Sequence, residues 1–130
     1  MAKSFEVAEV FAASPEEIYH AWLDSAEHAQ MTGGGPAQAT PEVGAEFSAW
    51  DGYISGKNLE LVPGKRIVQA WRTTEFAESD ADSRLEVQLE AVDGGTRVTL
   101  RHSNLPSDGE QYRQGWLDYY FTPMKEFFVK

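Results

Sequence analysis

Cysteine is absent from the 130-residue sequence, and basic residues are scarce. The absence of cysteine excludes disulfides, thiol catalysis and cysteine metal sites. Lysine and arginine together number 11, against 21 aspartates and glutamates, which gives a net charge of −10. Phosphate backbones and anionic lipids repel so acidic a chain, so we expect neither nucleic acid nor a membrane among its partners.

Long apolar runs and catalytic motifs are missing as well. Glu6 and Glu9 interrupt the apolar residues near the N-terminus, which argues against a signal-peptide core or a membrane span. No zinc-peptidase, nucleotide-binding, paired-carboxylate or serine-hydrolase motif occurs. Because the composition does not change along the chain, we predict one domain, residues 1–130, in a cytoplasmic protein without a cofactor.

Two segments have part of the pattern of a ligand site. His20, Asp24 and His28 are spaced four apart, as on a metal-binding helix face. However, residues 24–27 match a helix start, and a cap at Asp24 would turn the chain and separate the two histidines. We therefore predict no metal site. The glycines at 33–35 lack the lysine and hydroxyl residue of a phosphate-binding loop, and we interpret residues 33–43 as a mobile connection.

The remaining pattern predicts a strand, two short helices, six strands and a last helix. Residues 4–13 indicate the first strand. Ser14, Pro15 and Glu17 match a capped helix start, which predicts a helix to about residue 23, and a second one follows to about residue 31. Strands between turn signals are predicted over residues 45–50, 52–56, 58–61, 66–74, 83–91 and 96–103.

The C-terminal stretch, residues 107–130, has helical periodicity and an unusually aromatic apolar face. Aromatic side chains bury roughly 150–250 Å² each, so this face requires a sheet as its partner. Pro123 is expected to kink or divide the helix. Gly115 is predicted to let the helix approach the sheet closely beside Trp116, so that a leucine there would overpack the interface.

These elements predict an α+β fold. About seven antiparallel strands would form a curved sheet around the long C-terminal helix, with two short helices after the first strand. The first strand would return beside the last and nearly close the sheet. We expect a cavity, because a concave sheet and a single helix do not fill the space between them.

Five segments follow one another in an order that is familiar from a known family: residues 14–22 (SPEEIYHAW), 51–56 (DGYISG), 61–72 (LVPGKRIVQAWR), 95–100 (GTRVTL) and 115–116 (GW). Together they resemble the START-like domains of the activator of heat-shock protein 90 ATPase homologue family. Residues 47–52 and 113–121 are especially similar to the C-terminal domain of its eukaryotic co-chaperone. The resemblance implies the helix-grip fold of the START-like (SRPBCC) superfamily, which the birch-pollen allergen shares.

Members of that superfamily bind hydrophobic ligands, contact chaperones or catalyse cyclisations, so the resemblance leaves three functions open. We favour non-enzymatic binding of a small hydrophobic or amphipathic ligand by a monomer or homodimer. The alternatives are a chaperone-accessory interaction domain and, third, a cyclase or hydrolase. Polar candidates for such chemistry are His102, Arg72, Tyr53, Asp51 and Tyr119, but no residue is assigned as catalytic. The predicted cavity walls are Phe47, Trp50, Tyr53, Leu59, Trp71, His102, Trp116 and Tyr120.

Overall fold

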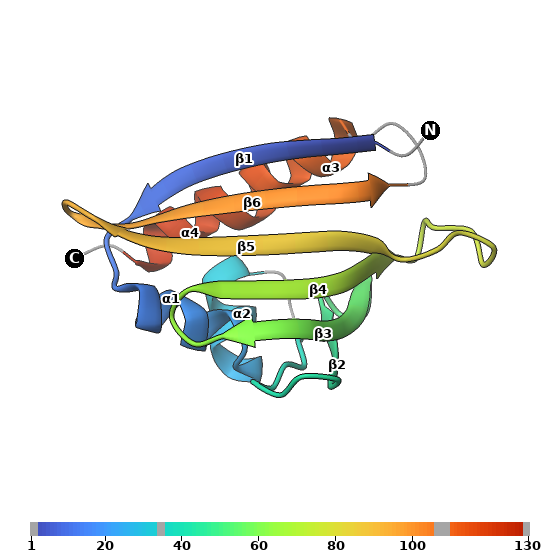
Figure 1. Cartoon of the computed structure of the whole chain (residues 1–130), viewed down its shortest axis with the longest axis horizontal. Coiled ribbons are helices and arrows are strands. Elements are labelled where there is room, and N and C mark those ends of the chain that lie inside the picture. The colour runs from blue at the N-terminus through green and yellow to red at the C-terminus, as the bar shows by residue number, and fades with distance from the viewer. Residues whose placement is uncertain (1–2, 34–35, 106–109, 129–130) are drawn as a thin grey trace.

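The computed structural model describes residues 3–33, 36–105 and 110–128. Strands and helices follow one another in the predicted α+β order (Figure 1). The elements are β1 (Lys3–Phe11), α1 (Pro15–Trp22), α2 (Ser25–Thr32), β2 (Glu46–Ala49), β3 (Ile54–Val62), β4 (Arg66–Thr73), β5 (Ser83–Val92), β6 (Gly95–Leu105), α3 (Glu110–Gly115), the π-helical turn η1 (Trp116–Phe121) and α4 (Thr122–Phe127).

The six strands form one antiparallel sheet in the order β1-β6-β5-β4-β3-β2. The predicted return of the first strand beside the last is confirmed, since β1 pairs with β6. The sheet nevertheless stays open, with β1 and β2 at its edges. The prediction of separate strands at 52–56 and 58–61 is wrong. The chain there forms the single strand β3, in which a bulge between Asn58 and Glu60 adds one residue without ending the strand.

Both short helices begin where the sequence predicts. The Ser14 hydroxyl accepts a hydrogen bond from the Glu17 amide at 3.1 Å, and the Glu17 carboxylate accepts one from the Ser14 amide at 3.0 Å. Asp24 caps α2 by accepting from the Glu27 amide at 3.0 Å. Helix α1 contacts β5, whereas α2 contacts η1 and α4, so the two helices link the sheet to the C-terminal segment.

The C-terminal helix is unbroken over residues 110–127 but changes to π-helical geometry before Pro123, where the sequence predicts a kink or division. Proline lacks a backbone donor, and in a regular α-helix its ring would clash with the carbonyl four residues earlier, that of Tyr119. The helix widens instead: the Thr122 amide bonds the carbonyl of Leu117, five residues back, and the Thr122 hydroxyl donates to the same oxygen at 2.9 Å. Parts of the predicted helix, residues 107–109 and 129–130, lie outside the described residues.

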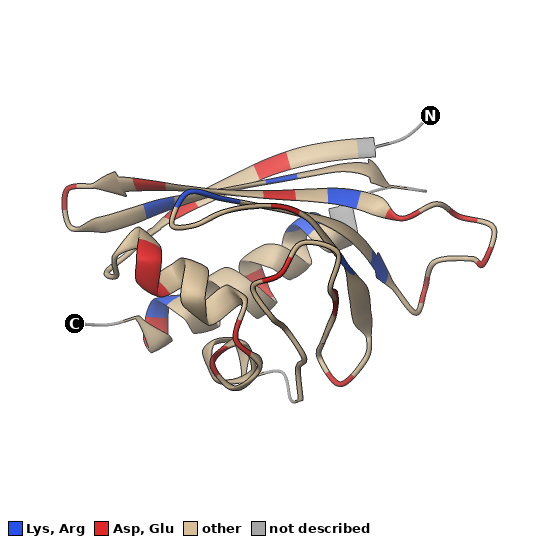
Figure 2. Cartoon of the chain, turned by 60° about the horizontal axis from the view of Figure 1, so that its bottom comes forward, with Lys and Arg blue, Asp and Glu red and all other residues tan. Residues whose placement is uncertain are grey.

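The two faces of the sheet differ in chemistry. The inner face packs under the helices and carries paired apolar residues such as Ile67 opposite Val87 and Leu89 opposite Val98. The outer face carries charged side chains in register, with Glu86 between Val68 and Arg101. Figure 2 shows Lys and Arg mainly on the strands, whereas Asp and Glu also mark the loops and helices. The hydrophobic core therefore lies between the inner face and the C-terminal segment.

Candidate functional site: an aromatic pocket beneath the C-terminal helix

A pocket of about 390 Å³ opens between the sheet and the C-terminal helix. It lies at the end of the sheet where the β2–β3 turn and the β4–β5 loop approach α3 and η1. We call it the aromatic pocket, because seven of its ten lining residues have aromatic side chains. The lining residues are Trp50, Tyr53, Ile54, Trp71, Glu75, Tyr112, Gly115, Trp116, Tyr119 and Tyr120.

The inner wall of the aromatic pocket is rigid. Trp71 projects from β4 and Trp116 from η1, and their ring centroids lie 5.6 Å apart. Tyr112 lies 5.6 Å from Trp71, and Tyr120 lies 4.6 Å from Trp116. All four side chains are buried in the core. Interlocked rings of this kind hold their positions, so the inner wall is formed before any ligand enters.

The mouth of the aromatic pocket is formed by the tight β2–β3 turn and by the exposed ring of Tyr119. Trp50 and Asp51 both have left-handed backbone conformations, with φ of 54° and 55°. The turn carries Trp50 towards the helix, where its ring lies 5.6 Å from that of Tyr119. Tyr119 is 60% exposed, unlike the rings of the inner wall. Tyr119 therefore borders the mouth on the solvent side.

A hydrogen-bonded acid supplies the polar part of the lining. The Tyr53 hydroxyl donates to Glu75 Oε2 at 2.9 Å. Burial raises the pKa of Tyr53 to about 12, and the bond to Glu75 acts in the same direction, so that the hydroxyl stays protonated. The Glu75 amide donates to Thr73 Oγ1 at 3.1 Å, which ties the acid to the end of β4.

His102 lies behind the inner wall, fully buried and fully bonded. The Trp116 indole N–H donates to its Nδ1 at 3.0 Å, so the ring proton must sit on Nε2, which is 2.7 Å from Ser83 Oγ. The Ser83 hydroxyl donates onward to the Trp71 carbonyl at 2.7 Å. Burial lowers the pKa of His102 to about 3. Since its Nε2 donates to Ser83 and does not accept, this pair is no serine–base couple.

A second buried histidine fixes Tyr120. His28 Nδ1 is 2.9 Å from the Trp22 carbonyl, which can only accept, so the Tyr120 hydroxyl donates to His28 Nε2 at 2.7 Å. Burial lowers the pKa of His28 despite the bond to Trp22. Burial also raises the pKa of Tyr120, against the opposing effect of a hydrogen bond from the Trp50 side chain. Both imidazoles are thus neutral supports of the aromatic walls.

The structure brings together most of the residues that the sequence assigned to a cavity. Trp50, Tyr53, Trp71, Trp116 and Tyr120 line the aromatic pocket. The other three lie elsewhere. Phe47 packs in the core over Gly56, His102 supports Trp116 from behind, and Leu59 is 47% exposed.

Leu59 faces solvent because it follows the buried Asn58 in β3, and successive side chains of a strand point to opposite faces. It is the extra residue between Asn58, which pairs with Gln69, and Glu60, which pairs with Val68. The extra residue shifts the alternation that follows it, so that Leu61 returns to the inner face opposite Ile67. Sequence reasoning did not place Ile54, Glu75, Tyr112 or Gly115 in the cavity, and it considered Tyr119 only as a polar candidate.

Gly115 corrects the sequence prediction most clearly. A Cβ atom at this position would meet only the Tyr119 ring, at 3.8 Å. The predicted close contact between Gly115 and the sheet is therefore wrong, because Gly115 faces the aromatic pocket. The missing side chain contributes to the open volume there.

The polar candidates do not form a reaction centre. Arg72 is bound at the outer side of the β4–β5 loop, where it pairs with Asp82 at 2.8 Å and donates to the Ala77 carbonyl at 2.9 Å. Asp51 is exposed in the β2–β3 turn, and neither residue lines the aromatic pocket. The arrangement suits binding better than catalysis.

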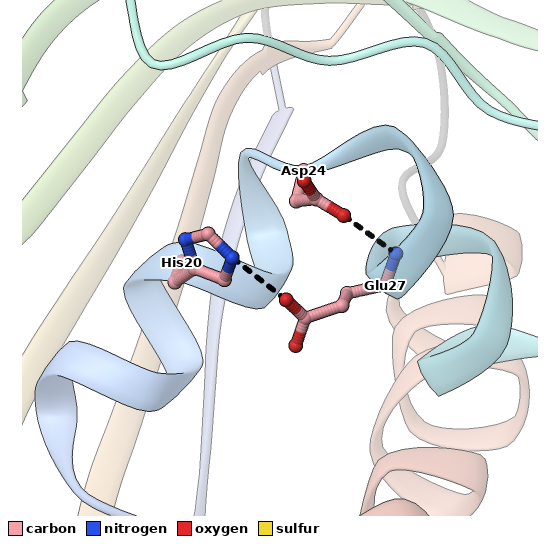
Figure 3. Close-up of side chains that lie close together, drawn as sticks. All are labelled: His20, Asp24 and Glu27. Atoms are coloured by element: carbon pink, nitrogen blue, oxygen red, sulfur yellow. Dashed lines mark hydrogen bonds and ion pairs between the residues drawn. The ribbon is translucent and has the colours of Figure 1, made fainter.

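His20, Asp24 and Glu27 form a small cluster on the surface of α1 and α2 (Figure 3). Their nearest ligand atoms lie within 4.8 Å of one another, close enough to consider a metal ion. His20 Nε2 already lies 2.7 Å from the Glu27 carboxylate, however, and Asp24 caps α2. The predicted separation of His20 from His28 is confirmed, since His28 points inward to Tyr120. The cluster alone assigns no metal.

Known proteins match this fold over almost the whole chain. Residues 12–128 match the family described as Activator of Hsp90 ATPase homolog 1-like protein. The chain belongs to this family. The activator of 90 kDa heat shock protein ATPase homolog 1 of Homo sapiens is 33% identical over 123 residues, which cover 92% of this chain and 35% of the human protein. This chain thus spans about a third of the length of that relative.

Solved structures of similar proteins extend the comparison. An HSP90 activator from Plasmodium falciparum superimposes with a TM-score of 0.87 at 26% identity, over 95% of this Hsp90-activator-like chain and 94% of that one. The Aha1 dimer from Colwellia psychrerythraea has a TM-score of 0.74 at 20% identity, covering 97% and 96% of the two chains, and shares the fold. No helix in the described part of the chain is long and apolar enough to cross a membrane.

Proposed function

We propose that this Hsp90-activator-like domain binds a small hydrophobic or amphipathic molecule in the aromatic pocket. The supporting observation is the pocket itself. Its volume of about 390 Å³ falls within the usual range of ligand sites, roughly 300–1,000 Å³. Its walls are mainly apolar, and Tyr53 and Glu75 supply a small polar group near the mouth. An apolar body would lie against Trp71 and Trp116, with a polar end towards Glu75.

Native mass spectrometry and a thermal-shift panel test this proposal. The purified chain is weighed under non-denaturing conditions and then heated with a panel of lipids and aromatic compounds. We expect a retained small molecule, or a rise in melting temperature with at least one amphipathic class. Gly115→Leu is the matched variant, because its side chain would occupy the pocket. No retained species and no shift above noise in the wild type would contradict the proposal.

A second candidate function is chaperone contact, and the comparisons favour it. The human relative and the Plasmodium falciparum structure are both named as activators of heat shock protein 90. We propose that the acidic surface of this chain meets a basic surface of such a chaperone, with a net charge of −10 supplying long-range attraction.

The chaperone proposal is tested by ATPase rates and co-sedimentation. Adding the chain should raise or lower the ATPase rate of the chaperone from the same organism, and the effect should weaken with salt. Sedimentation of the chain alone distinguishes a monomer from a homodimer. An unchanged rate together with no co-sedimentation at low salt would remove this candidate and would leave the ligand proposal standing.

A further inference from the structure

We propose that the ligand of the aromatic pocket is an uncharged, largely apolar molecule with a hydrogen-bond acceptor, such as an aromatic ketone. Its acceptor is bound by the indole N–H of Trp71 and by the hydroxyl of Tyr112. This rests on the proposed ligand-binding function, and it names the chemical class of the ligand and the two donors that select it.

The aromatic lining is rich in hydrogen-bond donors. Its seven aromatic side chains are all tryptophan or tyrosine, so each of them carries one N–H or O–H group. A donor that is removed from water without gaining an acceptor is costly, so buried N–H and O–H groups are nearly always bonded. Each lining donor therefore needs an acceptor from the protein, from water or from a ligand.

Three donors on the helix side are already bonded within the protein. The Trp116 indole donates to His102 Nδ1 at 3.0 Å, and the Tyr120 hydroxyl donates to His28 Nε2 at 2.7 Å. The Trp50 side chain bonds the Tyr120 oxygen. These three rings offer a ligand an apolar surface and no free donor.

Two further donors of the lining are also satisfied. The Tyr53 hydroxyl donates to Glu75 Oε2 at 2.9 Å. Tyr119 is 60% exposed, so water can bond its hydroxyl. Five of the seven donors thus require nothing from a ligand, and the donors of Trp71 and Tyr112 are left.

The indole N–H of Trp71 is a buried donor without a partner. Trp71 is only 3% exposed, and in the described part of the chain its N–H meets no acceptor. In that part, Arg66 Nε is the one fully enclosed side-chain nitrogen or oxygen that lacks a hydrogen bond. The Trp71 nitrogen lacks a bond but is not enclosed, so it must reach open space. The open space that Trp71 lines is the aromatic pocket.

The hydroxyl of Tyr112 is the second available donor. Tyr112 is 9% exposed, and its ring centroid lies 5.6 Å from that of Trp71. Its oxygen is 3.4 Å from Thr73 Oγ1, longer than the usual range of about 2.5–3.0 Å for a bond between hydroxyls. Thr73 Oγ1 also accepts from the Glu75 amide at 3.1 Å. The Tyr112 hydroxyl thus lies at the Glu75 end of the pocket, with a proton to donate.

The charge of the lining indicates a neutral acceptor. None of the described lining residues is lysine, arginine or histidine, so a carboxylate or phosphate would find no counter-charge there. The net charge of −10 repels anions as well. A hydrocarbon would fill the pocket but would leave both donors unbonded. An uncharged carbonyl oxygen satisfies both conditions, because it accepts hydrogen bonds and brings no charge.

A ketone and its parent hydrocarbon separate hydrogen bonding from shape. 1-Tetralone and tetralin have nearly the same size and differ in one carbonyl group. Each is titrated into the ¹⁵N-labelled chain, and the Trp71 indole signal is identified by its loss in Trp71→Phe. We expect tetralone to bind more tightly and to move the Trp71 indole proton further downfield than tetralin does. The Trp116 indole, bonded to His102, is the internal control and should respond equally to both probes.

The outcomes distinguish this inference from the proposed function. Tighter binding of tetralin, or equal shifts of the Trp71 proton with both probes, would overturn the inference and leave a pocket for apolar ligands. Absence of binding by both probes would overturn the inference and would also count against ligand binding in this pocket.

A pair of tyrosine variants tests the second donor. Tyr112→Phe removes the available hydroxyl and keeps the ring, so it should weaken tetralone binding about threefold without changing the affinity for tetralin. Tyr53→Phe is the matched control, because it removes a lining hydroxyl that is already bonded to Glu75. It should leave the ratio of the two affinities unchanged. Equal ratios in the two variants would show that Tyr112 does not bind the acceptor.

A pair of tryptophan variants tests the first donor. Trp71→Phe should shift the ratio of the two affinities towards tetralin by about threefold or more, because the unbonded N–H is lost. Trp50→Phe removes a lining N–H that is bonded to Tyr120 and should keep the wild-type ratio. The ratio corrects for any general change in the shape of the pocket. If Trp71→Phe retains the wild-type ratio, the assigned role of Trp71 is wrong; if it does not fold, the Trp71 proton shift in the wild type decides.

Discussion

At the scale of single residues, the buried histidines explain how an aromatic wall stays in place without strain. His102 accepts from Trp116 and donates to Ser83, while His28 accepts from Tyr120. Each imidazole satisfies an N–H or O–H group that would otherwise be buried without a partner, which costs about 1–3 kcal/mol. Protonation would place a donor opposite the Trp116 N–H at His102, and at His28 it would remove the acceptor of the Tyr120 hydroxyl proton. The support of the wall therefore depends on both histidines being neutral.

The first prediction is a loss of stability in mild acid. The pKa of His102 is about 3 in the fold, against about 6.5 in the unfolded chain, so the unfolded state takes up a proton first as the pH falls. The contribution of His102 is complete above about pH 6.5 and should fall by about 2 kcal/mol by pH 5. The pKa of His28 is also lowered, so it adds to the loss.

Urea denaturation at several pH values between about 7.5 and 5 measures this effect. The control is His20→Gln, which removes an exposed imidazole and leaves both buried histidines in place. A free energy of unfolding that stays constant over this range would contradict the neutral, bonded state of His102.

The second prediction contrasts two glycines. A Cβ at Gly56 would run into the Ala70 carbonyl and lie 2.7 Å from the Phe47 ring, so Gly56→Ala should cost about 3 kcal/mol or more. Gly115 has only Tyr119 nearby, at 3.8 Å, and sits in a helix, so Gly115→Ala should gain up to about 1 kcal/mol. Denaturant melts measure the free energy of unfolding of both variants. A loss of stability in Gly115→Ala comparable to that in Gly56→Ala would contradict the assigned position of Gly115.

At the scale of elements, the β2–β3 turn and the C-terminal helix together shape the aromatic pocket. The Gly52 amide bonds the Ala49 carbonyl at 3.2 Å, with Trp50 and Asp51 left-handed between them. Hairpin turns of this geometry favour Asn-Gly, and larger residues in them are strained. The π-helical turn before Pro123 sets the orientation of Tyr119 and Tyr120. Both elements depart from regular geometry where they meet the pocket.

The third prediction concerns strain in that turn. Asp51→Gly relieves a left-handed conformation with φ of 55° and should raise the free energy of unfolding by about 1 kcal/mol. Asp51→Ala removes the same carboxylate but keeps a Cβ atom on the left-handed backbone, so its free energy of unfolding should not rise. The two variants are compared by urea denaturation. Equal stability of both would indicate that the turn is unstrained.

The elements were more predictable than the site, for physical reasons. Helix caps and the spacing of apolar residues predicted both short helices, and Pro123 predicted an irregularity in the last helix, because these signals are local. Strand alternation predicted that Trp71 points inward, and the helical repeat predicted the same for Trp116. The β3 bulge could not be foreseen, and it returns Leu61 to the inner face, whereas Leu59 lies on the solvent face next to the buried Asn58. Glu75 lies in a loop, where no helix or strand repeat predicts the direction in which a side chain points. Gly115 shows that a small residue can mark a void as well as a close contact.

At the scale of the whole molecule, charge is divided between two faces. The outer face of the sheet carries paired arginines and glutamates, including Glu86, which is largely buried. Burial would raise the pKa of Glu86, but hydrogen bonds from Gln88 and Arg84 and the charge of Arg66 outweigh it and lower that pKa. The acidic surplus falls instead on loops and helices (Figure 2). Repulsion among these acids opposes the compact state.

The fourth prediction is therefore that salt stabilises the chain. Exposed ion pairs contribute only about 0–1 kcal/mol each, so screening the surplus of negative charge should outweigh screening of the pairs. The melting temperature should rise between about 20 and 300 mM NaCl. Sucrose at matched water activity controls for general exclusion effects. A melting temperature that falls with salt would show that the ion pairs of the outer face dominate.

The central claim is that the aromatic pocket is an accessible ligand site, and one titration tests it most directly. The neutral fluorescent probe N-phenyl-1-naphthylamine is added to the wild type and to Gly115→Leu, whose new side chain would fill the pocket beside Trp116. The account predicts saturable binding at one site in the wild type, and its loss in a Gly115→Leu variant that remains folded. Equal binding by both proteins, or no binding by the wild type, would contradict it.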